Sequence, residues 1–159
     1  MDPVNVRWDA NQVVFQWPDT RLVSRVLEGE FPEYASVIPK EFNASATVHH
    51  GKLMESLRVS GVFSSRLNDV RFTIKPSKKI IALSSSDSLS GANDAQVAVE
   101  SAEGKEITAP FDYRYLIDVL GVLDSRRPLT ISLTDAERPA FIRQEGDNSY
   151  FYILMPLRI

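Results

Sequence analysis

Apolar and polar residues alternate along two short runs near the start of the chain, VNVRW at residues 4–8 and VVFQW at residues 13–17. A period of two is typical of β-strands. Three of the four residues between these runs, DAN at residues 9–11, favour a turn, so the pattern predicts a β-hairpin. Residues 20–29 (TRLVSRVLEG) predict a third strand.

The next stretch, FPEYASVIPK at residues 31–40, contains two prolines. Proline disfavours helix at itself and at the residue before it, so we expect an extended, non-helical linker here. Its four large apolar side chains predict that this linker packs against other residues.

From about residue 44 onward the same order of elements is predicted twice. Each pass contains a strand, an amphipathic helix and three strands over roughly 55 residues, which indicates an internal repeat. The first pass has strands at residues 46–50, 69–75, 79–84 and 95–101 and a helix at residues 52–64. The second has strands at residues 105–109, 129–134, 140–144 and 149–157 and a helix at residues 113–125. We therefore expect an α+β fold, with a duplicated βαβββ unit and two helices packed on antiparallel sheets.

Composition narrows the class of protein. The 159 residues are 43% hydrophobic and 25% charged, with a net charge of −3 and no cysteine. This length allows one sizeable domain, or one domain plus a fragment of another. The lack of cysteine excludes disulfides and cysteine metal sites and fits a reducing cytoplasm. The first residues do not resemble a signal peptide and no apolar run is long enough to span a membrane, so we expect no membrane association.

Catalytic motifs are missing from the sequence. It has no phosphate-binding loop, nucleophile elbow or HExxH motif. The only two histidines, His49 and His50, are adjacent in a predicted strand and would point to opposite faces, so they cannot share a metal. Asp112, just before the second helix, is a candidate N-cap. We therefore expect no enzyme activity, no metal and no cofactor.

Residues 151–159, FYILMPLRI, are apolar on both faces of a predicted strand. Such a strand should be covered on both faces. Two interpretations stay open from the pattern alone: the strand is core, or it forms one wall of a groove that binds a partner.

Three basic residues lie on the predicted helices, Lys52 and Arg58 on the first and Arg114 at the start of the second. They are candidates to face DNA, where they would contact phosphates without reading the sequence. The alternative is that they only make the helices soluble. With a net charge of −3, we expect binding to duplex DNA to be weak.

Several stretches together resemble the C-terminal part of the bacterial sliding clamp, the β subunit of DNA polymerase III. They are GEFPEYASVIPK (residues 29–40), YLIDVL (115–120), LTD (133–135) and YILMPLRI (152–159). The family's clamp is a ring of two chains around duplex DNA, with three similar domains in each chain. The resemblance implies that residues 1–30 are the last strands of the second domain, residues 31–43 a linker and residues 44–159 the third, C-terminal domain. The first domain and most of the second would then be missing.

The resemblance also implies a groove beside the C-terminal strand. In the family this groove accepts peptides similar to Gln-x-Leu-x-Phe from DNA polymerase subunits, the clamp loader and repair proteins. The matching positions here are Pro32, Ser36, Val37, Glu137, Pro139, Ile153, Met155, Pro156, Leu157, Arg158 and Ile159. Ser36 stands where some members have arginine.

Ring closure in the family uses apolar residues at the end of the first helix, which Val62 and Phe63 match. Their partner domain would be missing, so we do not expect a ring dimer from this chain alone. The leading hypothesis is a non-catalytic clamp portion that tethers DNA polymerase, is cytoplasmic and associates with the bacterial nucleoid. The alternative is a natural truncated regulator that competes for clamp partners or blocks clamp assembly.

Overall fold

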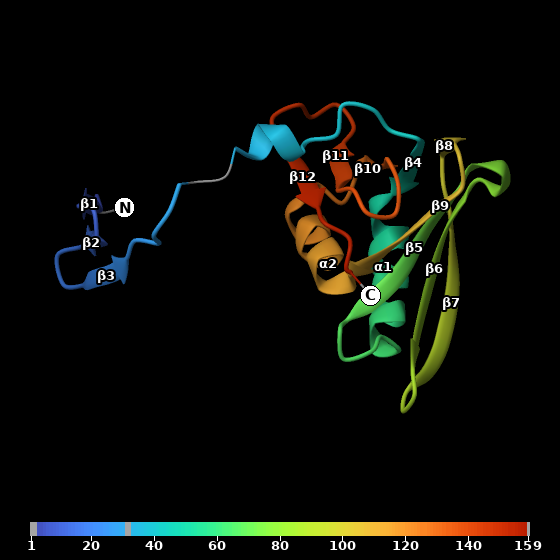
Figure 1. The fold of residues 1–159 in the computed structure, drawn as a ribbon, viewed down its shortest axis with the longest axis horizontal. Helices are drawn as coiled ribbons and strands as arrows, with labels where there is room; N and C mark the ends of the chain where they lie inside the picture. Colours follow the sequence, from blue (N-terminus) through green and yellow to red (C-terminus); the bar gives the residue numbers. More distant parts are fainter. Residues whose placement is uncertain (1–2, 31–32, 159) are drawn as a thin grey trace. The chain divides into compact units, whose positions relative to one another are not determined.

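A computed structural model describes residues 3–30 and 33–158 of the chain. The chain divides into two compact units, Met1–Tyr34 and Ala35–Ile159 (Figure 1). Within the described residues, all of the buried side chains lie in the second unit.

The N-terminal unit is a three-stranded antiparallel sheet of β1 (Asn5–Trp8), β2 (Gln12–Gln16) and β3 (Arg21–Arg25). The predicted hairpin is confirmed, because β1 pairs with β2 in antiparallel register. In the turn, the Asp9 carboxylate accepts hydrogen bonds from the backbone N–H groups of Asn11 and Gln12. The third strand is shorter than predicted and ends at Arg25.

The linker prediction was wrong in one respect. A short 3-10 helix, η1 (Tyr34–Val37), lies within the stretch that was expected to be extended. A proline restricts only itself and the residue before it, so the residues between the two prolines can still form a turn. Phe42, farther along, packs its ring on Phe141 with centroids 5.6 Å apart.

The C-terminal unit contains the two predicted passes of β-α-β-β-β. The first consists of β4 (Ala44–His49), α1 (His50–Val62), β5 (Asp69–Lys75), β6 (Ile80–Asp87) and β7 (Gly91–Ala98), with a 3-10 turn η2 (Pro76–Lys78) before β6. The second consists of β9 (Ile107–Asp112), α2 (Tyr113–Val122), β10 (Pro128–Leu133), β11 (Ala140–Gln144) and β12 (Phe151–Leu154). Between them lies a strand that sequence reasoning missed, β8 (Ser101–Gly104).

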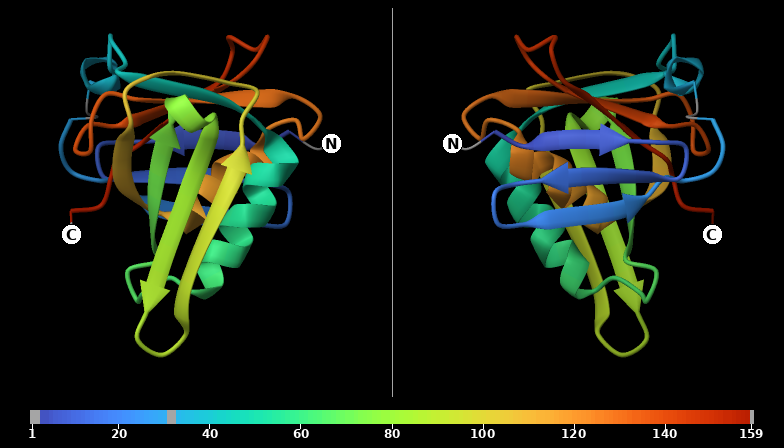
Figure 2. Two further views of the ribbon diagram at one scale, coloured as in Figure 1. Left: turned by 90° about the vertical axis from the view of Figure 1, so that its right-hand side faces the viewer. Right: turned by 90° about the vertical axis from the view of Figure 1, so that its left-hand side faces the viewer.

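The two passes exchange their first strands. One sheet has the order β12-β11-β10-β4-β8 and the other β7-β6-β5-β9. The first strand of each pass therefore pairs with a strand of the other pass: Ala44 of β4 lies opposite Leu133, and Asp112 of β9 lies opposite Asp69. The α+β fold with a duplicated unit on antiparallel sheets is confirmed. The long β6–β7 hairpin extends past the C-terminal end of α1 (Figure 2).

The two helices run antiparallel and touch at both ends. Near the end of α1, Gly61 lies directly against the ring of Tyr113, the first residue of α2. At the other end, His50 Nε2 lies 2.7 Å from the carbonyl oxygen of Leu120. His50 is the first residue of α1 rather than part of a strand, and it is buried while His49 is exposed.

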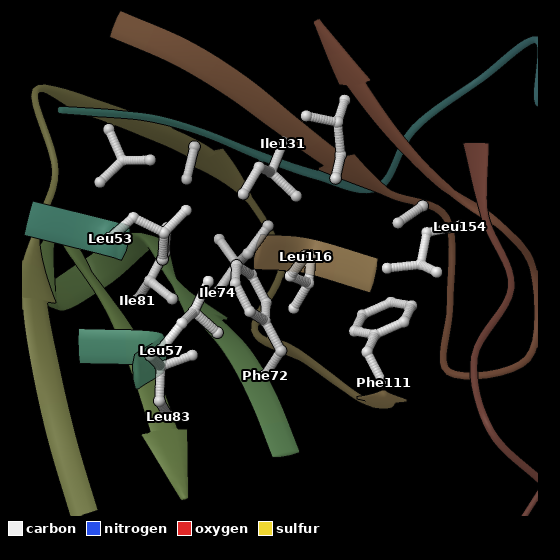
Figure 3. Packing of buried hydrophobic residues seen from close by; sticks show 14 of the residues in the cluster. Leu53, Leu57, Phe72, Ile74, Ile81, Leu83, Phe111, Leu116, Ile131 and Leu154 are labelled. Atoms are coloured by element: carbon white, nitrogen blue, oxygen red, sulfur yellow. The ribbon is translucent and has the colours of Figure 1, made fainter. Parts of the chain in front are cut away.

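The core lies between the two helices and the two sheets. Leu53 and Leu57 from α1 meet Leu116 from α2 and side chains of β5, β6 and β10 (Figure 3). Strand alternation places the apolar side chains on the inner faces of the sheets, so that the outer face of β4 and β10 carries serine and threonine.

Candidate functional site

The last residues do not continue as a strand to residue 157, as the sequence predicted. β12 ends at Leu154, and residues 155–158 leave the sheet. Pro156 has no N–H to donate to a strand partner, which explains the early end. The N–H of Leu157 instead donates to the carbonyl oxygen of Pro110 in β9, at 2.8 Å. We call residues 155–158 the tail; it passes from the edge of the five-stranded sheet to the edge of the four-stranded one.

Tail side chains differ in their exposure. Pro156 is buried and Leu157 half-buried, whereas Met155 is 54% exposed. Leu154, just before the tail, is part of the core. The core interpretation therefore holds for Leu154, whereas the groove interpretation stays a prediction for the tail, which borders the surface.

A hollow of about 630 Å³, which we call the linker hollow, lies on one side of Met155. Its lining is Ser36, Val37, Ile38, Pro39, Lys40, Glu41, Arg138, Pro139 and Met155. A second hollow of about 600 Å³, the tail hollow, lies on the other side. Its lining is Pro110, Ala136, Glu137, Arg138, Met155, Pro156, Leu157 and Arg158.

Met155 and Arg138 line both hollows and so form the ridge between them. The volumes lie in the range of about 300–1,000 Å³ that is typical of ligand pockets. Both hollows mix apolar side chains with a few charged ones, an arrangement that can hold an apolar side chain of a ligand and orient its backbone.

A tight turn at residues 135–138 positions Arg138. The carboxylate of Asp135 accepts hydrogen bonds from the N–H groups of Glu137 and Arg138, at 2.9 and 2.8 Å. These two bonds, helped by the nearby Arg138 charge, lower the pKa of Asp135. The carboxylate also lies 3.3 Å from Arg138 Nε, so the turn and the guanidinium are held together.

Hydrogen bonds to the end of β10 and the residue after it hold residues 38–41, which form the other wall of the linker hollow. Thr134 Oγ1 donates to the carbonyl oxygen of Glu41 at 2.9 Å, and Asn43 Nδ2 donates to the carbonyl oxygen of Thr134 at 2.8 Å. The N–H of Asn43 donates to the carbonyl oxygen of Leu133. Residues 38–41 therefore reach the linker hollow from a fixed anchor at the sheet.

The structure brings most of the predicted groove residues together. Ser36, Val37 and Pro139 line the linker hollow, and Met155 lines both hollows. Glu137, Pro156, Leu157 and Arg158 line the tail hollow.

Three predicted groove residues are placed differently. Ile153 lies opposite Phe141 in the sheet and lines neither hollow. Pro32 and Ile159 lie outside the described residues. Sequence reasoning missed Arg138, residues 38–41 and Pro110; Arg138 stands between two residues that were named, so the signal was adjacency in the turn.

The basic residues on the helices differ in their surroundings. Lys52 and Arg58 are exposed on α1. Arg114 is paired with Asp112, its Nη2 lying 2.6 Å from Asp112 Oδ2. Hydrogen bonding from Arg114 lowers the pKa of Asp112, which is also the N-cap of α2 as the sequence predicted. The Arg114 charge is therefore largely compensated.

Val62 and Phe63 lie at the C-terminal end of α1. Val62 is 67% exposed, and Phe63 is partly buried as the C-cap residue. In the neighbouring β6–β7 turn, the Asp87 carboxylate accepts hydrogen bonds from the N–H groups of Leu89 and Ser90. These hydrogen bonds lower the pKa of Asp87, so its carboxylate stays ionised and keeps a negative charge at this turn.

Within residues 3–30 and 33–158, no three or more His, Asp or Glu side chains cluster in a way that would hold a metal ion. Nor does any helix of the described chain have the length and apolar character needed to cross a membrane.

Comparison with known proteins gives a consistent result. Residues 35–158 match the family described as "DNA polymerase III beta subunit, C-terminal domain". The chain is 30% identical over 152 residues to the beta sliding clamp of Synechococcus elongatus, covering 95% of this chain and 40% of that protein. It is 31% identical over 160 residues to the beta sliding clamp of Synechocystis sp., covering 99% of this chain and 40% of that protein. The chain thus spans about 40% of the length of these relatives.

Solved structures agree with this. The beta subunit of DNA polymerase III from Thermotoga maritima is 28% identical, with a TM-score of 0.77 over 98% of this chain and 42% of its own. The sliding clamp from Bacillus subtilis is 26% identical, with a TM-score of 0.78 over 98% of this chain and 41% of its own.

Proposed function

Because this chain belongs to the family formed by the C-terminal domain of the DNA polymerase III beta subunit, we propose that it serves as a portion of a sliding clamp that recruits replication and repair proteins. The family consists of non-enzymatic processivity factors of DNA replication. The proposed role is accordingly to hold partners, without catalysis and without a cofactor. Residues 1–30 would correspond to the end of the second clamp domain, residues 31–43 to a linker and residues 44–159 to the third domain.

The observation that carries this proposal is the pair of hollows on either side of Met155. Two hollows of similar size, separated by one ridge, suit a short extended peptide with two large apolar side chains. A leucine would enter one hollow and an aromatic ring the other. We expect such peptides to resemble Gln-x-Leu-x-Phe.

The expected affinity is the balance of side-chain burial, backbone hydrogen bonding and the ordering of the peptide. Burying one large apolar side chain contributes about 1.5–3 kcal/mol, and a backbone hydrogen bond adds about 1 kcal/mol. Ordering a flexible peptide opposes these gains. The expected dissociation constant is on the order of tens to hundreds of micromolar.

The test is binding of a fluorescent Gln-Leu-Ser-Leu-Phe peptide, measured by anisotropy. Leu157→Lys places a charge in the tail hollow and should weaken binding at least tenfold. The matched control is Leu89→Lys, which makes the same change at a leucine that is 90% exposed and lines neither hollow. If the peptide binds both folded variants and the unaltered chain equally, the tail is not a groove wall and the proposal fails.

We also propose roles in DNA contact and in contact with another clamp domain, and a place of action. Lys52 and Arg58 would face duplex DNA and contact it weakly, with Arg114 contributing less because of Asp112. Val62 and Phe63 would meet another clamp domain, and we do not expect this chain alone to close a ring. The place of action would be the bacterial cytoplasm at the nucleoid.

A further inference from the structure

Three phenylalanine rings form a stack on the outer face of the five-stranded sheet. Phe141 in β11 lies opposite Ser132 in β10, so it shares the outer face that carries serine and threonine. Its ring centroid lies 5.6 Å from that of Phe42 and 5.4 Å from that of Phe151. Both distances lie within the range of about 4.5–7 Å that aromatic pairs prefer. Phe141 therefore joins two rings from distant parts of the chain, and we call the three rings the aromatic stack.

The aromatic stack lies outside the core. Phe42 and Phe151 are 37% and 40% exposed, and none of the three rings belongs to the buried cluster between the helices and the sheets. Nor does any of them line the linker hollow or the tail hollow. Core packing and direct contact with a peptide in these hollows thus do not account for the stack.

The chain contributes to the linker hollow through three lining segments, which are residues 36–41, residues 138–139 and Met155. Each lining segment is close in sequence to one ring of the stack. Phe42 directly follows the first lining segment, and Phe141 comes two residues after the end of the second. Phe151 is the first residue of β12, and Met155 directly follows the last residue of that strand. The stack therefore links all three lining segments to one another.

Regular secondary structure holds these segments only in part. Residues 38–41 and 155–158 lie outside any helix or strand. β12 has four residues and, as the edge of its sheet, pairs only with β11. Short edge strands and irregular segments open more readily than the core of a sheet. Contacts between the rings add a connection where backbone pairing is sparse.

We propose that the aromatic stack positions the three lining segments of the linker hollow, with Phe141 as the central positioning residue, and so sets how tightly a peptide binds. This inference rests on the proposed function of the two hollows. A hollow whose lining is already held in place needs less ordering when a peptide binds, which raises affinity. Aromatic pairs of this kind contribute an amount that corresponds to about two- to tenfold in an equilibrium constant.

The test replaces Phe141 by leucine, which removes the ring and keeps an apolar side chain at a half-buried position. Binding of the fluorescent Gln-Leu-Ser-Leu-Phe peptide, measured by anisotropy, should weaken about three- to tenfold. Phe141→Tyr keeps the ring and should bind within twofold of the unaltered chain. The matched control is Phe63→Leu, the same change at a half-buried phenylalanine that is outside the stack and lines neither hollow. This control should change affinity less than twofold.

Hydrogen exchange distinguishes positioning from a general loss of stability. The N–H groups of Asn43 and Leu157 lie close in sequence to two lining segments, and each donates to a backbone carbonyl oxygen. The N–H of Tyr113, at the start of α2, also donates to a backbone carbonyl oxygen and serves as the reference. In Phe141→Leu, the first two should exchange at least threefold faster, while the reference should change less than twofold.

Variants of the outer rings test whether the stack acts as a unit. Phe42→Leu and Phe151→Leu each remove one ring contact at a more exposed position, so they keep the test decisive if Phe141→Leu does not fold. Each should weaken peptide binding about two- to fivefold. Because the contact between Phe42 and Phe141 is already lost in Phe141→Leu, adding Phe42→Leu should weaken binding no further. Losses that multiply would contradict a stack that acts as a unit.

The proposed function and this inference fail in different ways. If the unaltered chain binds no peptide, or if Leu157→Lys binds it equally tightly, the proposed function fails, and the exchange of the Asn43 and Leu157 N–H groups still decides whether the stack positions the lining segments. The positioning role is overturned if the unaltered chain binds the peptide and Phe141→Leu binds it equally tightly, or if Phe63→Leu loses as much. It is also overturned if the Tyr113 N–H is accelerated by the same factor as the other two.

Discussion

The ends of α1 and α2 have the same two residues in different surroundings. Each helix ends in Gly-Val, Gly61–Val62 in α1 and Gly121–Val122 in α2. The valines are similarly exposed, at 67% and 71%. A Cβ on Gly61 would clash with the ring of Tyr113, whereas a Cβ on Gly121 would meet nothing within 4 Å.

This difference shows that the duplicated unit is not packed symmetrically. The end of α1 meets the start of α2 through a glycine and an aromatic ring in contact. The end of α2 meets the start of α1 through a hydrogen bond between His50 and the Leu120 carbonyl. One contact excludes any side chain at the glycine, and the other does not involve the glycine at all.

The largest expected effect is at Gly61. Gly61→Ala should destabilise the C-terminal unit by about 2 kcal/mol, because overpacking costs more than the gain in helix propensity. Urea denaturation followed by far-UV circular dichroism measures the change. Tryptophan fluorescence would not, since both tryptophans lie in the other unit.

Gly121→Ala is the matched control and should have the opposite sign. With open space around the new Cβ, alanine should stabilise the unit by roughly 0.5–1 kcal/mol through helix propensity. Equal effects of the two substitutions would show that the contact with Tyr113 does not limit residue 61.

The beginnings of the helices differ as well, and Asp112→Ala tests this. Asp112 caps α2 by accepting a hydrogen bond from the Arg114 N–H at 3.0 Å, whereas His49 at the start of α1 makes no capping hydrogen bond through its side chain. Loss of the cap should cost about 1–2 kcal/mol. His49→Ala is the control and should change the unfolding free energy by less than about 0.5 kcal/mol. Comparable losses from both would mean that capping does not distinguish the helices.

Acid should weaken the start of α2 before the start of α1. Hydrogen bonding from the Arg114 side chain lowers the pKa of Asp112 from its ordinary value of 3.8. A lowered carboxylate pKa gives stability that is fully present above the unfolded value and is lost as pH falls through the folded one. Hydrogen-exchange protection of the first turn of α2 should therefore fall below about pH 4, and Arg114→Gln should make this fall smaller. Equal loss of protection at the starts of α1 and α2 would contradict the prediction that acid weakens α2 first.

Sequence periodicity was sufficient to predict the repeat and most of the core residues. Leu53 and Leu57 on α1 and Leu116 and Val119 on α2 are buried as their spacing predicts. β8 was missed because its four residues, SAEG, are short and polar and become a strand only by pairing with β4. The strand at the C-terminus was predicted too long because the effect of Pro156 on pairing was not considered.

The candidate site was less predictable from residues alone. Its composition followed from the family resemblance, but the ridge between the hollows depends on where Arg138 is held by Asp135 in a turn of the chain. No periodicity encodes that placement. The asymmetry between Gly61 and Gly121 is equally hidden, since it depends on a ring from a distant part of the sequence.

The smallest expected effect comes from a substitution at His49 that gives α1 the side-chain cap that it lacks. His49 has extended backbone angles, φ −68° and ψ 125°, which suit an N-cap residue. An aspartate here can accept a hydrogen bond from the N–H groups at the start of α1, and its charge is favourable beside the positive end of the helix dipole. His49→Asp should therefore stabilise the C-terminal unit by roughly 0.5–1 kcal/mol relative to His49→Ala, measured by urea denaturation with circular dichroism.

His49→Asn separates the two contributions to this cap. Asparagine can make the same hydrogen bond without a charge, so it should keep most of the gain, and the part that aspartate adds should shrink at high salt. If neither variant exceeds His49→Ala, the start of α1 is already satisfied by other means. The contrast between an open helix start in the first repeat and a capped one in the second would then have no energetic meaning.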